Sequence, residues 1–166
     1  MRPAGYWLKP SLLLTRRVQK RTLLINDTET KLLAGIKNPV KAAQHVLGLG
    51  PKLLVVKHGE YGATAFFGPN ILNADGRPRH PFRAPALPLA EVVDPTGAGD
   101  SFAGGFFGYL ASQSELTAQS FRKAMFYGGV MGSFAVERFG TERMQSLTRE
   151  EIDARFQIFR ELTHLD

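Results

Sequence analysis

The 166-residue sequence contains no cysteine. It can therefore form neither a disulfide nor a thiolate metal site, which fits a reducing compartment such as the cytoplasm. It also lacks any run of 18 or more apolar residues, so no membrane-spanning helix is predicted. The Gly-x₄-Gly-Lys-Ser/Thr sequence of P-loop kinases is absent, and no Gly-x-Gly-x-x-Gly opens the first strand–helix turn as in Rossmann dehydrogenases. The first absence excludes a P-loop kinase, and the second argues against a Rossmann dehydrogenase.

Acidic residues are missing from the N-terminal segment, residues 1–21. Six of the 21 basic residues precede the first acidic residue, Asp27, so residues 22–166 carry 15 basic and 15 acidic residues. The net charge of +6 therefore belongs to the segment and not to the globular portion. A solvated amphipathic helix over 11–20 is the favoured interpretation; a transit-like leader and a nucleic-acid-binding arm are the alternatives. No recognised nucleic-acid-binding motif is present.

Residues 91–107 combine a short apolar strand end, a turn rich in small residues and the start of a helix. Proline breaks the extended run after Val93, because it lacks the donor that a central strand needs. Two glycines follow, and from Asp100 apolar residues recur every four positions. A helix N-terminus after a glycine turn is an anion site, since unpaired N–H groups and the positive end of the helix dipole meet there. Alternatively, Asp100 only caps the helix.

The string at residues 94–106, Asp-Pro-Thr-Gly-Ala-Gly-Asp-Ser-Phe-Ala-Gly-Gly-Phe, resembles the C-terminal signature of the ribokinase-like (PfkB-type) carbohydrate kinases. The resemblance implies that Gly97, Ala98 and Gly99 supply backbone amides to the transferring phosphoryl group. It also implies that Asp100 accepts the proton of a sugar or nucleoside hydroxymethyl group, with ATP as the donor and Mg²⁺ as the metal. The expected fold is a three-layer α/β fold with a largely parallel sheet flanked by helices.

Two upstream motifs occur in the order that this family shows. Asn26 and Glu29 follow an apolar strand at 22–25, and they are either a helix cap or the family's Asn-x-x-Glu motif, which holds Mg²⁺ through water. Lys57, Gly59 and Gly62 follow a second buried strand, at 53–56. They form either a plain turn or a loop that contacts the nucleotide phosphates.

A monovalent cation such as K⁺ is bound in some family members by the loop that follows the long helix near the C-terminus. The resemblance makes five residues candidates for such a site here: Asp94, Thr96, Ala135, Arg138 and Gly140.

Several other elements are expected from local patterns. Helices are predicted over 39–47, over 115–136 and from a capping box at 148–151 to about residue 162, and a strand is predicted over 63–67. Residues 68–90 hold five prolines and are predicted to form a hairpin with an irregular excursion.

The chain is short for this family, whose members usually run to roughly 300 residues as one large α/β domain. The sequence therefore resembles the C-terminal half alone, with residues 1–21 as the remnant of a truncated half and residues 22–166 as the nucleotide-binding and catalytic portion. Two functions are weighed: an ATP-dependent phosphotransferase, or a catalytically inactive nucleotide-binding remnant or subunit. An unpaired sheet edge predicts self-association or pairing with another chain.

Overall fold

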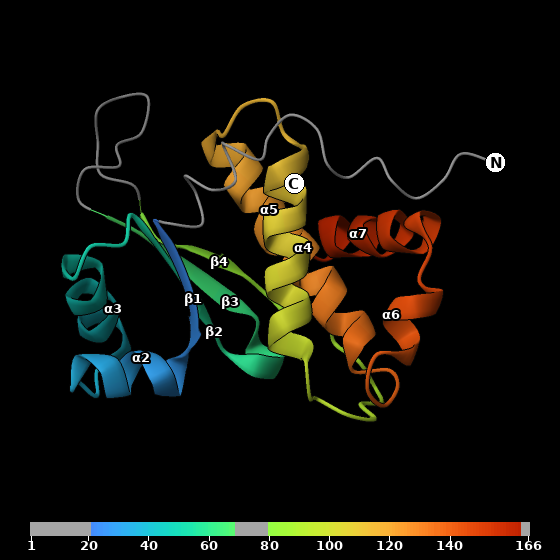
Figure 1. The fold of residues 1–166 in the computed structure, drawn as a ribbon, viewed down its shortest axis with the longest axis horizontal. Helices are drawn as coiled ribbons and strands as arrows, with labels where there is room; N and C mark the ends of the chain where they lie inside the picture. The colour runs from blue at the N-terminus through green and yellow to red at the C-terminus, as the bar shows by residue number, and fades with distance from the viewer. Residues whose placement is uncertain (1–20, 69–79, 164–166) are drawn as a thin grey trace. The chain divides into compact units, whose positions relative to one another are not determined.

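The computed structural model describes residues 21–68 and 80–163 (Figure 1). These residues divide between Ala84 and Pro85 into two compact units, which we call the sheet unit (21–84) and the helical unit (85–163). Each unit is described by itself. The helix expected over 11–20, and residues 69–79 of the excursion expected within 68–90, lie outside the described residues.

The sheet unit contains a mixed four-stranded sheet in the order β1-β2-β3-β4, formed by β1 (Thr22–Asn26), β2 (Leu53–Lys57), β3 (Ala63–Phe67) and β4 (Phe82–Ala84). The pair β1–β2 is parallel, whereas β2–β3 and β3–β4 are antiparallel. Of the parallel character expected for the sheet, the described strands show only a part, the β1–β2 pair. Only five residues join β2 to β3, which allows a hairpin but not a crossover, whereas two helices connect β1 to β2.

Two helices cover one face of this sheet, α2 (Asp27–Ala34) and α3 (Pro39–Gly48) (Figure 1). The helix predicted over 39–47 is confirmed, and the side chain of Asn38 caps it by accepting hydrogen bonds from two backbone amides. The core beneath the helices is made by buried apolar side chains of α3, β2 and β3: Ala43, Val46, Leu47, Leu54, Val56 and Phe66. The α/β class expected from the sequence is confirmed.

The helical unit consists of α4 (Ala98–Ser112), α5 (Ala118–Ala135), α6 (Glu142–Ser146) and α7 (Arg149–Thr163). Helices α4 and α5 approach closely because glycines face the contact. A Cβ added to Gly105 would lie 2.5 Å from the carbonyl oxygen of Tyr127, and one added to Gly128 would lie 2.9 Å from the Phe102 ring. The glycines of both helices therefore serve helix packing.

Aromatic side chains hold α7 against α5. Their core contains Val130, Phe134, Phe156 and Phe159. The Tyr127 ring stacks on the Phe156 ring at 4.5 Å between centroids and on the Tyr109 ring of α4 at 4.7 Å. The three helices thus share one stacked column of rings.

The structure corrects some expected elements of the helical unit. Val92 and Val93 are not in a strand, and they are 56% and 47% exposed. The helix expected from 115 begins at Ala118, after an N-cap at Thr117, and α6 was not predicted. The capping box at Thr148 is confirmed, since Glu151 and Thr148 exchange backbone-to-side-chain hydrogen bonds.

Candidate active site

The N-terminus of α4 presents backbone donors without acceptors. Gly97 is its N-cap residue and has a φ of 80°, a left-handed conformation that favours glycine. No side chain caps the helix. Among the described residues, the amides of Gly97, Gly99 and Asp100 have no hydrogen-bond acceptor. These donors, at the positive end of a 15-residue helix, are suited to bind an anion.

Asp100 lies in the first turn of α4 and is exposed. Its carboxylate has no hydrogen bond or ion pair with any residue that the structure describes. The interpretation that Asp100 only caps the helix is therefore wrong. A carboxylate that the described residues leave unengaged, next to amides without a described acceptor, is available to a bound molecule.

The turn before Gly97 is stabilised by the side chain of Asp94. The amide of Thr96 donates to Asp94 Oδ1 at 2.9 Å. Hydrogen bonds from the Thr96 amide, the Thr96 hydroxyl and the Gly140 amide lower the pKa of the Asp94 carboxyl. The amides of Val93 and Asp94 both donate to the carbonyl of Val136, at 2.8 and 3.3 Å. The segment after α5 therefore lies directly beside this turn.

The five candidate cation ligands are partly brought together. Asp94 and Thr96 share the turn, and Gly140, with a φ of 60°, faces the Asp94 carboxylate. Ala135 is the buried last residue of α5, directly before Val136. Arg138 is exposed.

In the sheet unit, Asn26 and Lys57 are register partners at the carboxyl ends of β1 and β2. The amide of Glu29 donates to Asn26 Oδ1 at 2.7 Å, and the amide of Asn26 donates to Glu29 Oε2 at 2.8 Å. The capping interpretation of this motif is thus confirmed. Asn26 Nδ2 and Glu29 Oε1 make no hydrogen bond to the described part of the chain, so both can still hold a water molecule.

The loop after β2 depends on its two glycines. Gly59 and Gly62 have φ values of 57° and 93°, and Gly59–Tyr61 forms a 3₁₀ turn. The amide of His58 closes the loop by donating to the Gly62 carbonyl at 2.8 Å. Lys57 is half-buried and has no ion-pair partner among the described residues. Its ammonium group can therefore meet an anion.

Two further side chains anchor this loop, and sequence reasoning missed both. The His58 ring lies 3.0 Å from the Thr64 hydroxyl, and Arg83 Nη2 donates to the Tyr61 carbonyl at 3.4 Å. Burial, and then the charge of Arg83, lower the pKa of His58. Thr64 and Arg83 are partners across β3 and β4, a pairing that no local sequence pattern indicates.

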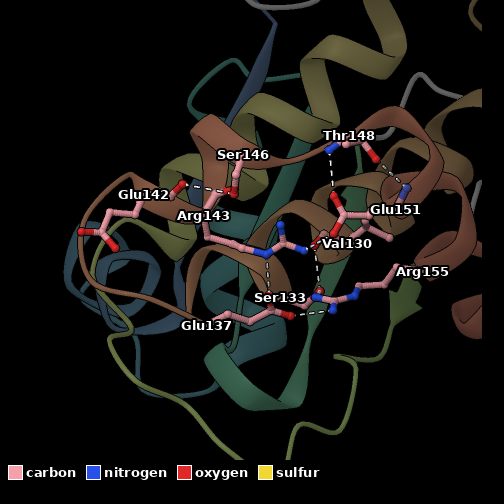
Figure 2. Close-up of polar contacts among 9 residues, drawn as sticks. All are labelled: Val130, Ser133, Glu137, Glu142, Arg143, Ser146, Thr148, Glu151 and Arg155. Carbon is pink, nitrogen blue, oxygen red and sulfur yellow. Dashed lines mark hydrogen bonds and ion pairs between the residues drawn. The ribbon is translucent and has the colours of Figure 1, made fainter.

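A network of charged side chains behind the segment after α5 was also missed (Figure 2). Glu137 binds Arg143 and Arg155, and Arg143 also binds Glu151. Burial raises the pKa of Glu137, but hydrogen bonds from the two arginines outweigh it and lower the pKa overall. These residues are far apart in the sequence and show no spacing that would connect them.

Within the described ranges 21–68 and 80–163, no three or more histidine, aspartate or glutamate side chains form a group that could hold a metal ion. Within the same ranges, no helix is long and apolar enough to cross a membrane.

Curated relatives of the chain are kinases. It is 37% identical over 98 residues to cytidine kinase of Thermococcus kodakarensis, a match that covers 56% of this chain and 31% of the relative. It is 36% identical over 84 residues to 2-dehydro-3-deoxygluconokinase of Thermoproteus tenax, covering 51% of this chain and 22% of the relative. The matches therefore span a third or less of these proteins.

The fold also matches solved structures of kinases. The fructokinase of Vibrio cholerae O395 with fructose, ADP and calcium matches with a TM-score of 0.68 and 21% identity, over 86% of this chain and 44% of that chain. The ribokinase of Thermotoga maritima matches with a TM-score of 0.66 and 25% identity, over 82% of this chain and 42% of that chain. The chain thus spans less than half the length of these structures.

A protein-family model settles the membership that the signature indicated. The model, described as pfkB family carbohydrate kinase, matches residues 11–148. This range contains the candidate residues of both units, from Asn26 to Gly140. The chain belongs to the pfkB family of carbohydrate kinases.

Proposed function

We propose that this chain carries the nucleotide-binding and phosphoryl-transfer residues of an ATP-dependent kinase that phosphorylates a hydroxymethyl group of a sugar or nucleoside. The observation that carries the proposal is the N-terminus of α4. There, amides without acceptors in the described chain directly precede Asp100, a carboxylate that the described residues leave unengaged. The names of two relatives, a cytidine kinase and a 2-dehydro-3-deoxygluconokinase, support this class of acceptor.

The roles follow from the chemistry of phosphoryl transfer. The transition state is loose and its charge is spread over the phosphoryl oxygens, so fixed donors aimed at that charge contribute most of the catalysis. The free amides of Gly97 and Gly99 would hold the transferring group, and the amide of Ala98 would join them by giving up its 3.3 Å bond to the Pro95 carbonyl. Asp100 would orient the acceptor hydroxyl and take its proton. The turn at Asp94 would keep these groups in place.

The nucleotide and metal sites rest on the sheet unit. Lys57 and the loop from Gly59 to Gly62 would contact ATP. Asn26 and Glu29 would hold Mg²⁺ through water, because each already uses one polar atom in the capping box and keeps another free of described partners. Mg²⁺ would neutralise phosphate charge, and it commonly keeps several water ligands.

A monovalent cation such as K⁺ would bind at the loop formed by the five cation candidates of the helical unit. The Asp94 carboxylate would supply the negative charge of that site. A fructokinase of Vibrio cholerae O395 has been crystallised with ADP and a potassium ion, which supports this assignment.

The alternative is an inactive nucleotide-binding chain or one subunit of a larger assembly. One observation favours it: this chain covers between 40% and 48% of the solved structures it matches. A complete acceptor site would then need a second copy or another chain.

Two substitutions separate these functions. Asp100→Asn removes the base and leaves the amides intact, so nucleotide affinity should persist while kcat falls by about 10²–10⁴. Asp94→Asn loosens the turn, so binding and turnover should weaken together. Thermal shifts with ATP and Mg²⁺ measure binding, since ligand at about 100 times Kd stabilises by roughly 2.7 kcal/mol. Product formation is then measured on the same preparations, with sugars and nucleosides as acceptors.

Each outcome decides between the hypotheses. Full turnover of Asp100→Asn contradicts the role given to that residue. Nucleotide binding without turnover, by the chain alone and by the chain co-expressed with candidate partner chains, favours the inactive-subunit alternative. A folded wild-type chain that shows no shift at millimolar ATP contradicts both.

A further inference from the structure

The carboxylate of Glu137 is held by two arginines from different helices (Figure 2). Arg143 of α6 donates from Nε to Oε2 at 2.7 Å, and Arg155 of α7 donates from Nη2 to Oε1 at 2.5 Å. The side chains of Glu137, Arg143 and Arg155 are only 27%, 16% and 18% exposed. Both carboxylate oxygens are therefore engaged by charge-assisted hydrogen bonds in a largely water-excluded setting.

Each arginine is itself fixed by further contacts. Arg143 Nη2 donates to Glu151 Oε1 at 2.6 Å, and Arg155 Nη1 donates to the Ser133 hydroxyl at 3.2 Å. The two guanidinium carbons lie 4.8 and 3.4 Å from the centroid of the Phe134 ring. Isolated surface ion pairs contribute little to stability, whereas a connected and partly buried network holds its members in one geometry.

Glu137 is the member of the network that is next in sequence to Val136, the residue that bonds the turn before the candidate anion site. Glu137 directly follows Val136, whose carbonyl accepts hydrogen bonds from the amides of Val93 and Asp94. The Asp94 carboxylate in turn accepts from the amide of Thr96, the residue before the N-cap Gly97. A displacement of Glu137 would therefore be transmitted through three backbone amides to the N-terminus of α4.

We propose that Glu137, Arg143 and Arg155 form a positioning device, the Glu137 clamp, that fixes the Val136 carbonyl and through it the Asp94 turn and the amides at the N-terminus of α4. These residues touch no reacting atom. They hold the backbone that does. The consequence for nucleotide binding rests on the proposed function, whereas the structural effect on the turn does not.

The test compares two carboxylate-to-amide changes in the helical unit. Glu137→Gln removes the charge that both arginines share. Asp153→Asn is the matched control, because Asp153 of α7 pairs with the half-exposed Arg149, accepts from the Tyr127 hydroxyl at 3.4 Å and has no hydrogen bond to the turn among the described residues. Amide hydrogen exchange of Val93 and Asp94, measured by NMR, reports their bonds to Val136 directly.

Glu137→Gln should exchange these two amides about 10- to 100-fold faster, because it removes the negative charge and one of the two acceptor oxygens that the partly buried arginines share. Asp153→Asn should leave their exchange within about twofold of wild type, since an exposed pair contributes little. ATP affinity should fall about tenfold in Glu137→Gln, because binding must then order a turn that the clamp no longer holds in place. It should stay unchanged in Asp153→Asn.

A second variant covers the case in which Glu137→Gln does not fold. Arg155→Lys keeps the charge but loses the planar guanidinium whose two nitrogens bond Ser133 and Glu137 separately, so it should produce a smaller effect in the same direction. Unchanged exchange of Val93 and Asp94 in the folded variant overturns the proposal, and so does an equal effect of Asp153→Asn. Loss of folding in both clamp variants overturns it as well, since these residues would then be general structural supports. If wild type binds no ATP, the proposed function fails and the exchange comparison still decides on the clamp.

Discussion

Alanine substitutions at neighbouring glycines of α4 should have opposite effects on stability. Gly104 and Gly108 are exposed, and a Cβ at either position would meet no atom within 4 Å. Gly105 faces α5, where a Cβ would lie 2.5 Å from the Tyr127 carbonyl oxygen and 2.6 Å from Met131 Cγ. All three substitutions bring the same gain in helix propensity, so the difference between them isolates the helix–helix contact.

The magnitudes follow from two opposing effects. Replacing glycine by alanine in a helix interior stabilises by about 0.5–1 kcal/mol, because the unfolded chain loses freedom and the helix gains a better former. At Gly105 the new methyl group collides with backbone, which cannot rotate away as a side chain can. Overpacking of this kind costs about 1–3 kcal/mol, so Gly105→Ala should be destabilised overall by about 1–2 kcal/mol.

Urea denaturation followed by circular dichroism measures these changes. Gly104→Ala and Gly108→Ala should unfold at higher urea and Gly105→Ala at lower urea than wild type, with unchanged m-values. In thermal melts, 1 kcal/mol corresponds to about 2–4 °C for a chain of this size. If Gly105→Ala is as stable as Gly104→Ala, then α4 and α5 do not pack as closely as the structure shows.

Two further predictions concern pH and helix capping. Hydrogen bonding to Arg143 lowers the pKa of Glu151 to about 2 from 4.5, so this carboxylate stabilises the fold above pH 4.5 and the stabilisation is lost as the pH falls toward 2. Urea midpoints measured between pH 7 and pH 2 should therefore decline less in Glu151→Gln than in wild type. An equal decline would contradict the ion pair. Asn26→Ala removes the N-cap of α2 and should cost about 1 kcal/mol in urea unfolding, with Asn38→Ala at the start of α3 as the control of equal expected cost. If only Asn26→Ala also weakens ATP binding in thermal shifts, the metal role of Asn26 is supported; equal ATP binding by both variants would contradict it.

The local features of the site could be predicted from the sequence because each depends on residues within about four positions. The capping boxes that begin at Asn26 and Thr148 are closed by side chains three residues away. The positive φ of Gly59, Gly62 and Gly97 requires a residue without a Cβ, so glycine marks these turns in the sequence itself.

Interactions between distant segments could not be predicted in the same way. The five-residue loop between β2 and β3 could have indicated their antiparallel pairing, but no such local feature indicated that β4 pairs with β3. Val93 looked like a strand residue, yet its amide bonds a carbonyl 43 positions later in the chain, outside any sheet. The glycines of α4 gave no sign of which one faces α5, because three of them have the same local setting and only one meets a neighbour.

The sequence by itself thus determined the position of the candidate anion site and of the candidate base, because the turn, the helix start and Asp100 lie within seven consecutive residues. Tertiary structure decided what holds that turn. Glu137 and Arg155 are 18 positions apart and come from different elements. The sequence does not indicate which of its many basic residues pairs with a given acidic residue. Only the packing of α7 against α5 brings the arginine to the glutamate, which is why the clamp behind the site became visible in the fold alone.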